Sequence, residues 1–331
     1  MKKTISDYCQ KIGSDSLLVQ GAGGNASWKD GDTLWVKASG TWLSDAANQN
    51  IFIPVDLSHI QHAISKGDFN ITPRTNGKSN LRPSIETLLH ALMPHKVVIH
   101  LHAVEILAHL IKSTCESYLH AQSGEVFVEY HKPGAALALA VNDALMGSDD
   151  VNVVFLKNHG VVIGGENIGE VDAVLQALIE RVKSDVIKPL NLSKPEGGIE
   201  SQVGLKYFPV EDEILHQLAV NPIYFEQLDN NWVLYPDHVV FLGAKAVTFS
   251  SLEQFQNDFL NENNPPVFIF IKDWGVFSLE SISSAQRAQL KCYYDVLSRI
   301  PVNCPMNTLS EDNIAELLNW DAEQYRMNLA K

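Results

Sequence analysis

Cysteine, basic residues and long apolar runs are all scarce in this chain of 331 residues, and each shortage excludes a class of protein. The four cysteines are scattered without a Cys-x-x-Cys pair, which fits a reducing cytoplasm better than a disulfide framework. Lys and Arg number 25 against 39 Asp and Glu, and the net charge of −14 disfavours nucleic acid as a partner. No apolar run reaches the roughly 18 residues that cross a bilayer, and the N-terminus lacks the apolar core of a signal peptide. We therefore expect a soluble, cytoplasmic protein without a membrane or nucleic-acid partner.

The composition is that of a globular protein, with 45% hydrophobic and 19% charged residues. The length favours about two domains. The segment KPLNLSKPEGG at 188–198 has the Pro, Gly and Ser content of a linker. We therefore predict one domain over residues 1–190 and a second over 199–331.

Apolar periodicity and turn signals predict mixed helices and strands in the first half. Helices are expected at 4–12, 56–66, 83–92, 103–112, 134–145 and 166–188, and strands at 26–28, 33–38, 97–101, 125–130 and 151–156. The polar stretch 70–82 is expected to be a loop.

The second half contains an echo of the first. Residues 153–171 and 268–286 both contain an apolar strand, a Lys-x-x-Gly turn, a second apolar strand and the start of a long helix. Trp274 stands where His159 stands in the first copy. If the repeat is real, the second domain kept the scaffold and lost the histidine.

Histidine is concentrated in the first half, since only His216 and His238 of the twelve histidines follow residue 160. His100 and His102 flank one residue at the end of an apolar strand, so both side chains point to the same face of the sheet. Two imidazoles in this arrangement can bind one metal ion, although each can also be satisfied separately by hydrogen bonds. His159, at another strand end, would complete a three-nitrogen site with open positions, as catalytic zinc prefers.

Glu86 is a candidate carboxylate for the same site. It falls in the first turn of the helix predicted after Pro83 and Ser84, where the helix dipole alone would favour it. The functional alternative makes Glu86 a general acid/base or a fourth ligand. His90, one turn later, would either orient Glu86 or form an ordinary i,i+4 pair with it.

The glycine-rich segment 21–24 does not predict a dinucleotide site. Ala26 stands where the third glycine of the fingerprint belongs, and a strand pair follows instead of a helix. Its backbone N–H groups can still bind one phosphate or carboxylate. Ser39-Gly40-Thr41 and Ser84 provide further donors.

Five short motifs follow one another along the first half. They are GGNAS at 23–27, ASG at 38–40, PSIETLLHALMP at 83–94, VVIHLHA at 97–103 and LKNHGVVIGG at 156–165. In this order they resemble the class II aldolase/adducin family, over about residues 5–185. The second half is similar to the C-terminal extension of the longer, sugar-aldolase-like branch.

The resemblance implies a fold, a metal site and a substrate site. The implied fold is a three-layer α/β/α sandwich on a mixed, largely antiparallel sheet, followed by a second, smaller α/β domain. His100, His102 and His159 match the family's zinc ligands, and Glu86 matches its catalytic acid/base. The positions that match the phosphate-binding residues are Gly24, Asn25, Ser39, Gly40 and Ser84. Homo-oligomers with sites near subunit interfaces are common in the family.

Three features depart from the family pattern or vary within it. Ala103 replaces the proline that often follows the histidine pair. Ser84 stands alone where many aldolases carry paired serines, so a substrate with a carboxylate or without phosphate is also conceivable. Catalytic tyrosines come from variable segments, and Tyr118 and Tyr130 are candidates by location.

The resemblance implies metal-dependent retro-aldol cleavage of a ketose phosphate or related sugar. Zn²⁺ is the expected ion, although manganese, cobalt or iron suit such ligands as well. Epimerases and a dehydratase of the same family use the same metal site and are the first alternative. A non-enzymatic, adducin-like interaction module is the second. The C-terminal domain is conceivable as a scaffold that covers the site or builds the oligomer.

Overall fold

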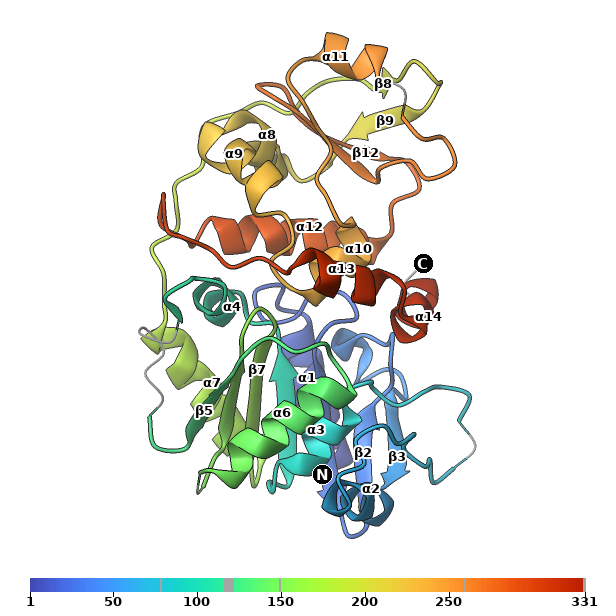
Figure 1. Ribbon diagram of the computed structural model, residues 1–331, viewed down its shortest axis with the longest axis vertical. Coiled ribbons are helices and arrows are strands. Elements are labelled where there is room, and N and C mark those ends of the chain that lie inside the picture. Colours follow the sequence, from blue (N-terminus) through green and yellow to red (C-terminus); the bar gives the residue numbers. More distant parts are fainter. Residues whose placement is uncertain (78, 116–121, 149, 259, 330–331) are drawn as a thin grey trace.

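The computed structural model describes the whole chain except residues 78, 116–121, 149, 259 and 330–331. Two β-sheets organise it, one in each half of the sequence. In Figure 1 the first half lies below and the second half above, with several C-terminal helices between the two sheets.

The first half contains a seven-stranded sheet in the order β3-β2-β1-β4-β7-β6-β5. All neighbouring strands are antiparallel except β5 and β6, which run parallel. Its elements are α1 (Lys2–Gly13), β1 (Asn25–Asp30), β2 (Thr33–Lys37), η1 (Leu43–Asp45), β3 (Phe52–Asp56), α2 (Leu57–Ser65), α3 (Thr87–Leu92), β4 (Val97–Leu101), α4 (Val104–Leu110), β5 (Glu125–Val128), α6 (Ala135–Met146), β6 (Val153–Leu156), β7 (Gly160–Gly165) and α7 (Ile168–Arg181).

Alternation along β4 shows how this sheet separates two hydrophobic layers. Val97, Ile99 and Leu101 pack with α1, α4 and α7 on one face. Val98 points to the opposite face and packs with α2, α3 and α6. Successive side chains of a strand point to opposite faces, so one strand serves both layers. The predicted three-layer sandwich on a mixed, largely antiparallel sheet is confirmed.

The second half contains a five-stranded sheet in the order β10-β11-β12-β9-β8, which confirms the smaller α/β part. Its elements are β8 (Ile199–Glu200), β9 (Lys206–Pro209), η2 (Glu213–His216), α8 (Gln217–Val220), α9 (Pro222–Asn230), α10 (Pro236–Leu242), β10 (Thr248–Phe249), α11 (Leu252–Asn257), β11 (Phe268–Ile271), β12 (Gly275–Leu279), α12 (Ser284–Leu297), α13 (Glu311–Leu318) and α14 (Asp321–Leu329). Among the described residues, no helix combines the length and apolar character needed to cross a bilayer.

Helix α4 joins the two halves. Its residues Val104, Leu107 and Ala108 belong to a core cluster formed mainly by the second half. Arg299 also pairs with Glu105 across the same interface, with Nε and Oε1 2.7 Å apart. Residues 183–198 contain neither helix nor strand. The division into domains 1–190 and 199–331 stays a prediction, and the two parts share one core.

Two predicted helix boundaries are wrong. Helix α3 begins at Thr87 instead of Pro83, because Pro83 forms a bridge with Ala38 and the Ser84 N–H donates to the Lys37 carbonyl. Glu86 is therefore the residue before the helix. Helix α7 ends at Arg181, and the Ser184 N–H then donates to Glu105.

The echo between the halves extends to backbone conformation. Strands β6 and β7 followed by α7 correspond to β11 and β12 followed by α12. Asn158 and Asp273 occupy matching turn positions and adopt φ of 50° and 58°. Asn and Asp tolerate this left-handed region better than most residues. The shared conformation supports the half-repeat, which stays a prediction.

The side chain of Asn158 forms hydrogen bonds with the second half, and we expect these bonds to stabilise the fold. Its Nδ2 donates to the carbonyls of Leu234 and Asn307, each at 2.8 Å. We expect Asn158→Gly to preserve the turn but leave these carbonyls unpaired, which lowers the free energy of unfolding by about 1–3 kcal/mol. Urea unfolding of the metal-free protein measures the change.

Asp273→Gly is the matched control, because Asp273 has the same backbone conformation but an exposed side chain. We expect it to change stability by less than about 0.5 kcal/mol. Equal effects of the two variants would contradict a stabilising role for the Asn158 hydrogen bonds.

Candidate metal centre

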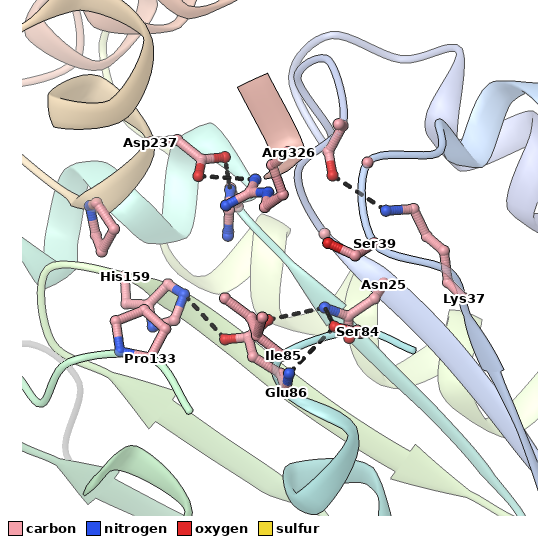
Figure 2. A pocket seen from close by; sticks show the side chains of 15 residues that line it. Asn25, Lys37, Ser39, Ser84, Ile85, Glu86, Pro133, His159, Asp237 and Arg326 are labelled. Atoms are coloured by element: carbon pink, nitrogen blue, oxygen red, sulfur yellow. Dashed lines mark hydrogen bonds and ion pairs between the residues drawn. The ribbon is translucent and has the colours of Figure 1, made fainter. Parts of the chain in front are cut away.

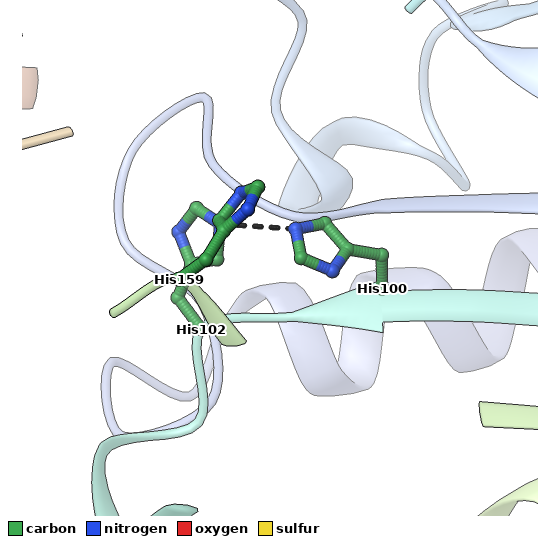
Figure 3. Close-up of side chains that lie close together, drawn as sticks. All are labelled: His100, His102 and His159. Carbon is green, nitrogen blue, oxygen red and sulfur yellow. Dashed lines mark hydrogen bonds between the residues drawn. The ribbon is translucent and has the colours of Figure 1, made fainter. Parts of the chain in front are cut away.

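Three buried imidazoles meet at the end of β4 (Figure 3). His100 lies in β4, His102 follows it directly, and His159 lies in the turn between β6 and β7. The register of β4 with β7 pairs Leu101 with Val161, which brings this turn beside the histidine pair. One nitrogen from each of the three rings lies within 4.8 Å of the others.

The arrangement fits a divalent metal. The Nε2 atoms of His100 and His102 are 3.1 Å apart, close to the roughly 3.3 Å between ligands of a tetrahedral zinc site with bonds of about 2.0–2.1 Å. Nδ1 of His100 lies 3.2 Å from the Val161 carbonyl oxygen. If Nδ1 carries the proton and donates it to this carbonyl, the lone pair of Nε2 is available for a metal ion. Burial lowers the pKa of His100 to about 4 and that of His159 to about 3. Both rings are therefore neutral at pH 7, as metal binding requires.

Glu86 faces the same cluster (Figure 2). Its Oε1 lies 3.2 Å from His159 Nε2, and its Oε2 lies 3.5 Å from His100 Nε2. Burial by itself raises the pKa of Glu86, but the imidazoles and the Asn25 amide lower it to about 2. The cluster thus combines three imidazoles with one carboxylate, which favours a cation.

Asn25 connects Glu86 to His90. The Asn25 amide donates to Glu86 Oε2 at 2.8 Å, and its carbonyl oxygen contacts His90 Nε2. His90 Nδ1 in turn lies 2.7 Å from the Ser27 hydroxyl. His90 is therefore linked to Glu86 through a residue of β1, a route that the i,i+4 spacing did not indicate.

A cavity of about 30 Å³ adjoins the cluster. The five residues that match the phosphate-binding positions of the family line it, together with Glu86, His102 and His159: Gly24, Asn25, Ser39, Gly40 and Ser84. Gly24 adopts φ of 59°, and a Cβ there would lie 3.0 Å from the His100 carbonyl oxygen, so the turn requires glycine. His100 lies behind this lining as part of the buried cluster.

Sequence reasoning did not include three charged residues that also line the cavity: Lys37, Asp237 and Arg326. Lys37 directly precedes the ASG motif, a signal that was available. Its Nζ donates to the Ala22 carbonyl at 3.0 Å. Asp237 and Arg326 come from the second half, where no motif marked them.

The structure describes one of the two candidate tyrosines, Tyr130, and it does not join the site. Tyr130 packs against the core cluster of the second half and is not among the cavity-lining residues. Tyr118 lies outside the described residues. Ala103 precedes α4.

Residues 3–183 match the family described as the Class II Aldolase and Adducin N-terminal domain. The chain is 29% identical over 200 residues to L-fuculose phosphate aldolase of Methanocaldococcus jannaschii, covering 57% of this chain and 97% of that protein. It is also 29% identical over 173 residues to the uncharacterized oxidoreductase YuxG of Bacillus subtilis. That match covers 47% of this chain and 25% of the B. subtilis relative, so the chain spans only a quarter of the length of that protein.

Among solved structures, the chain is similar to the N-terminal class II aldolase domain of a conserved protein from Thermoplasma acidophilum. The identity is 24% and the TM-score 0.47, with 54% of this chain and 90% of that chain covered.

The burial of Lys37 leads us to expect that the stability of the fold depends on pH. Burial, reinforced by Arg326, lowers its pKa from 10.5 to about 7 despite the nearby carboxylates. Between these two values the unfolded chain binds a proton that the folded chain does not, so the contribution of Lys37 to stability rises with pH. We expect the stability of wild type relative to Lys37→Met to rise by about 1–2 kcal/mol between pH 7 and 9. Parallel stability curves in urea titrations of the two proteins would contradict this assignment.

Proposed function

Because the chain belongs to the class II aldolase and adducin N-terminal domain family, we propose that it is a metal-dependent lyase. Its reaction would be retro-aldol cleavage of a ketose phosphate or a related sugar. The observation that carries this proposal is the convergence of three buried imidazoles and Glu86 beside a cavity lined with anion-binding groups. The M. jannaschii relative, a named sugar-phosphate aldolase matched over 97% of its length, supports the substrate class.

His100, His102 and His159 would hold one divalent ion, and Zn²⁺ suits their ligand set best. Manganese, cobalt and iron also accept imidazole and carboxylate ligands. The bound ion would act as a Lewis acid for the negative charge that develops on the substrate oxygens.

The anionic end of the substrate would lie against β1, β2 and the segment before α3. Gly24, Gly40 and Ser39 would offer N–H or hydroxyl donors, with Asn25 and Ser84 beside them. Lys37 adds a positive charge at the same cavity. Binding of a phosphate would favour the protonated form of Lys37, which helps to offset the net charge of −14.

Glu86 would carry the proton of the reaction. In cleavage, the hydroxyl group on the carbon that becomes the aldehyde loses its proton, the C=O bond forms, the adjoining C–C bond breaks, and the electron pair of that bond remains on the ketone fragment. That fragment then takes up a proton at carbon. Glu86 Oε1 makes no hydrogen bond to the described residues and lies 3.2 Å from His159 Nε2, so it would accept the first proton beside the metal ligands and deliver it to carbon.

The second half would control access. Pro236, Asp237 and Arg326 line the cavity from that side, and a volume of about 30 Å³ holds a few water molecules at most. A sugar phosphate is much larger. Substrate entry therefore requires the covering segments to move.

Metal content tests the proposed centre directly. We expect about one divalent ion per chain in the wild-type protein by elemental analysis, and its loss in His159→Gln. His62→Gln is the control, because His62 is an exposed residue of α2. Wild-type protein that binds no ion and gains no thermal stability from added Zn²⁺ would favour the adducin-like interaction module instead.

Product analysis distinguishes the reaction from its alternatives, since the epimerase and the dehydratase would use the same metal ligands. An aldolase releases two shorter fragments from a ketose phosphate, an epimerase yields an isomer, and a dehydratase loses water. We expect Glu86→Gln to reduce turnover by at least about 100-fold while the metal content is retained, because it removes an acid/base group. Near wild-type turnover in this variant would exclude the proposed role.

We also propose a cytoplasmic homo-oligomer. The four cysteines are scattered along the sequence without a Cys-x-x-Cys pair, as expected in a reducing compartment. Leu139 and Met146 of α6 are 46% and 79% exposed beside the edge strand β5, an apolar face that a second copy would cover. Light scattering measures the assembly, and a monomer at all concentrations would contradict this part.

A further inference from the structure

A carboxylate from the second half faces the outer edge of one candidate metal ligand. Asp237 Oδ2 lies 3.4 Å from Nδ1 of His102, and both residues are buried. Nε2 of the same ring points the other way, toward His100. Among the described residues, His102 Nδ1 has no hydrogen-bond partner, so Asp237 is the group placed to accept its proton.

Arg326 and Gln289 hold Asp237 in this orientation, and Figure 2 shows the contact with Arg326. Arg326 of α14 contacts Asp237 Oδ1 at 3.0 Å and also pairs with Glu323 at 2.8 Å. Gln289 of α12 lies 3.4 Å from Oδ2. The ion pair with Arg326 favours the carboxylate form of Asp237, so that one oxygen is occupied by Arg326 and the other faces His102.

Gly23 provides the space for this contact. A Cβ at Gly23 would lie 2.9 Å from Asp237 Oδ2 and 3.0 Å from His102 Nδ1. Any larger residue would therefore crowd the carboxylate and the ring. Tyr235 packs its ring edge-on against His102, with centroids 5.1 Å apart, so the imidazole is confined on a further side.

We propose that Asp237 is a positioning residue for the metal centre: it accepts the Nδ1 proton of His102 and so keeps the Nε2 lone pair directed at the ion. This inference rests on the proposed metal centre. His100 has the Val161 carbonyl at its own Nδ1, so the two neighbouring ligands are oriented by different partners. Histidine ligands commonly use such a carboxylate or carbonyl, which sets the tautomer and increases the basicity of the ring.

The consequence is that the second half helps to build the metal centre as well as cover it. The three ligands lie in the first half, while Asp237 lies in α10 and its holder Arg326 in α14. Metal affinity should therefore respond to changes in the second half that leave every ligand intact.

Asp237→Asn tests this in the full-length protein, since it removes the charge, keeps the size and leaves Arg326 its pairing with Glu323. We expect the affinity for Zn²⁺, measured by competition with a chromophoric chelator at one pH, to fall about 10- to 100-fold. Glu105→Gln is the matched control, because it breaks another carboxylate contact between the halves, that with Arg299, without contacting a ligand. We expect this control to bind Zn²⁺ like the wild type.

The tautomer of His102 gives a second readout that needs neither activity nor metal. In the metal-free protein labelled with ¹⁵N-histidine, we expect His102 to be protonated at Nδ1 in the wild type, with less of this tautomer in Asp237→Asn. The signal is assigned by its loss in His102→Gln. A merely structural role of Asp237 would leave the tautomer unchanged.

The outcomes separate this inference from the proposed function. If the wild type binds Zn²⁺ and Asp237→Asn binds it equally well, the positioning role is wrong while the metal centre stands. If the wild type binds no metal, the proposed function fails, and the tautomer alone decides whether Asp237 orients His102. If Asp237→Asn does not fold, Gly23→Ala replaces it, because the added methyl separates the same two groups without a change in charge. Unchanged affinity and tautomer in that variant would overturn the proposal.

Discussion

The antiparallel pairing of β4 with β7 is the constraint on which the candidate site depends. Its register places the end of β4 beside the turn that precedes β7, so His100, His102 and His159 approach within 4.8 Å. Both strands are central in the seven-stranded sheet, and every one of their residues is buried. The backbone that carries the imidazoles therefore has little freedom to relax, and the fold by itself holds the three nitrogens close together. Such preorganisation is the contribution that a scaffold makes to a metal site.

The second general feature is the burial of charge around this cluster. Glu86, Lys37, Asp237 and Arg326 are all less than one-tenth exposed. A buried charge destabilises the fold unless a partner compensates it, and removal of one partner leaves the other uncompensated. Glu86 accepts a hydrogen bond from Asn25 of the first half, whereas Asp237 forms an ion pair with Arg326 of the last helix. The electrostatics of the site therefore require both halves to be in place, which agrees with the core that they share around α4.

Much of the candidate site was predictable because its members occur in short segments with local rules. Strand alternation placed His100 and His102 on one face, and the glycines before Asn25 indicated a backbone that binds anions. The predictions from local sequence were wrong where a contact with a distant segment decided the structure. Proline is favoured in the first turn of a helix, yet Pro83 pairs with Ala38 instead and delays α3 to Thr87. His90 likewise contacts a residue of β1, which its spacing from Glu86 did not indicate.

The sequence by itself determined the family, the three-layer sandwich and the three histidines of the cluster. Period-two alternation and contiguous motifs can be read directly along the chain. Only the tertiary structure decided that the second half reaches this site. Asp237 and Arg326 are 89 residues apart, and neither belongs to a motif or to a periodic pattern. An ion pair between distant segments leaves no local signature, since it depends on how α10 and α14 pack against the first half. That packing is set by the shared core and by close approaches such as that at Gly23, which exist only in three dimensions.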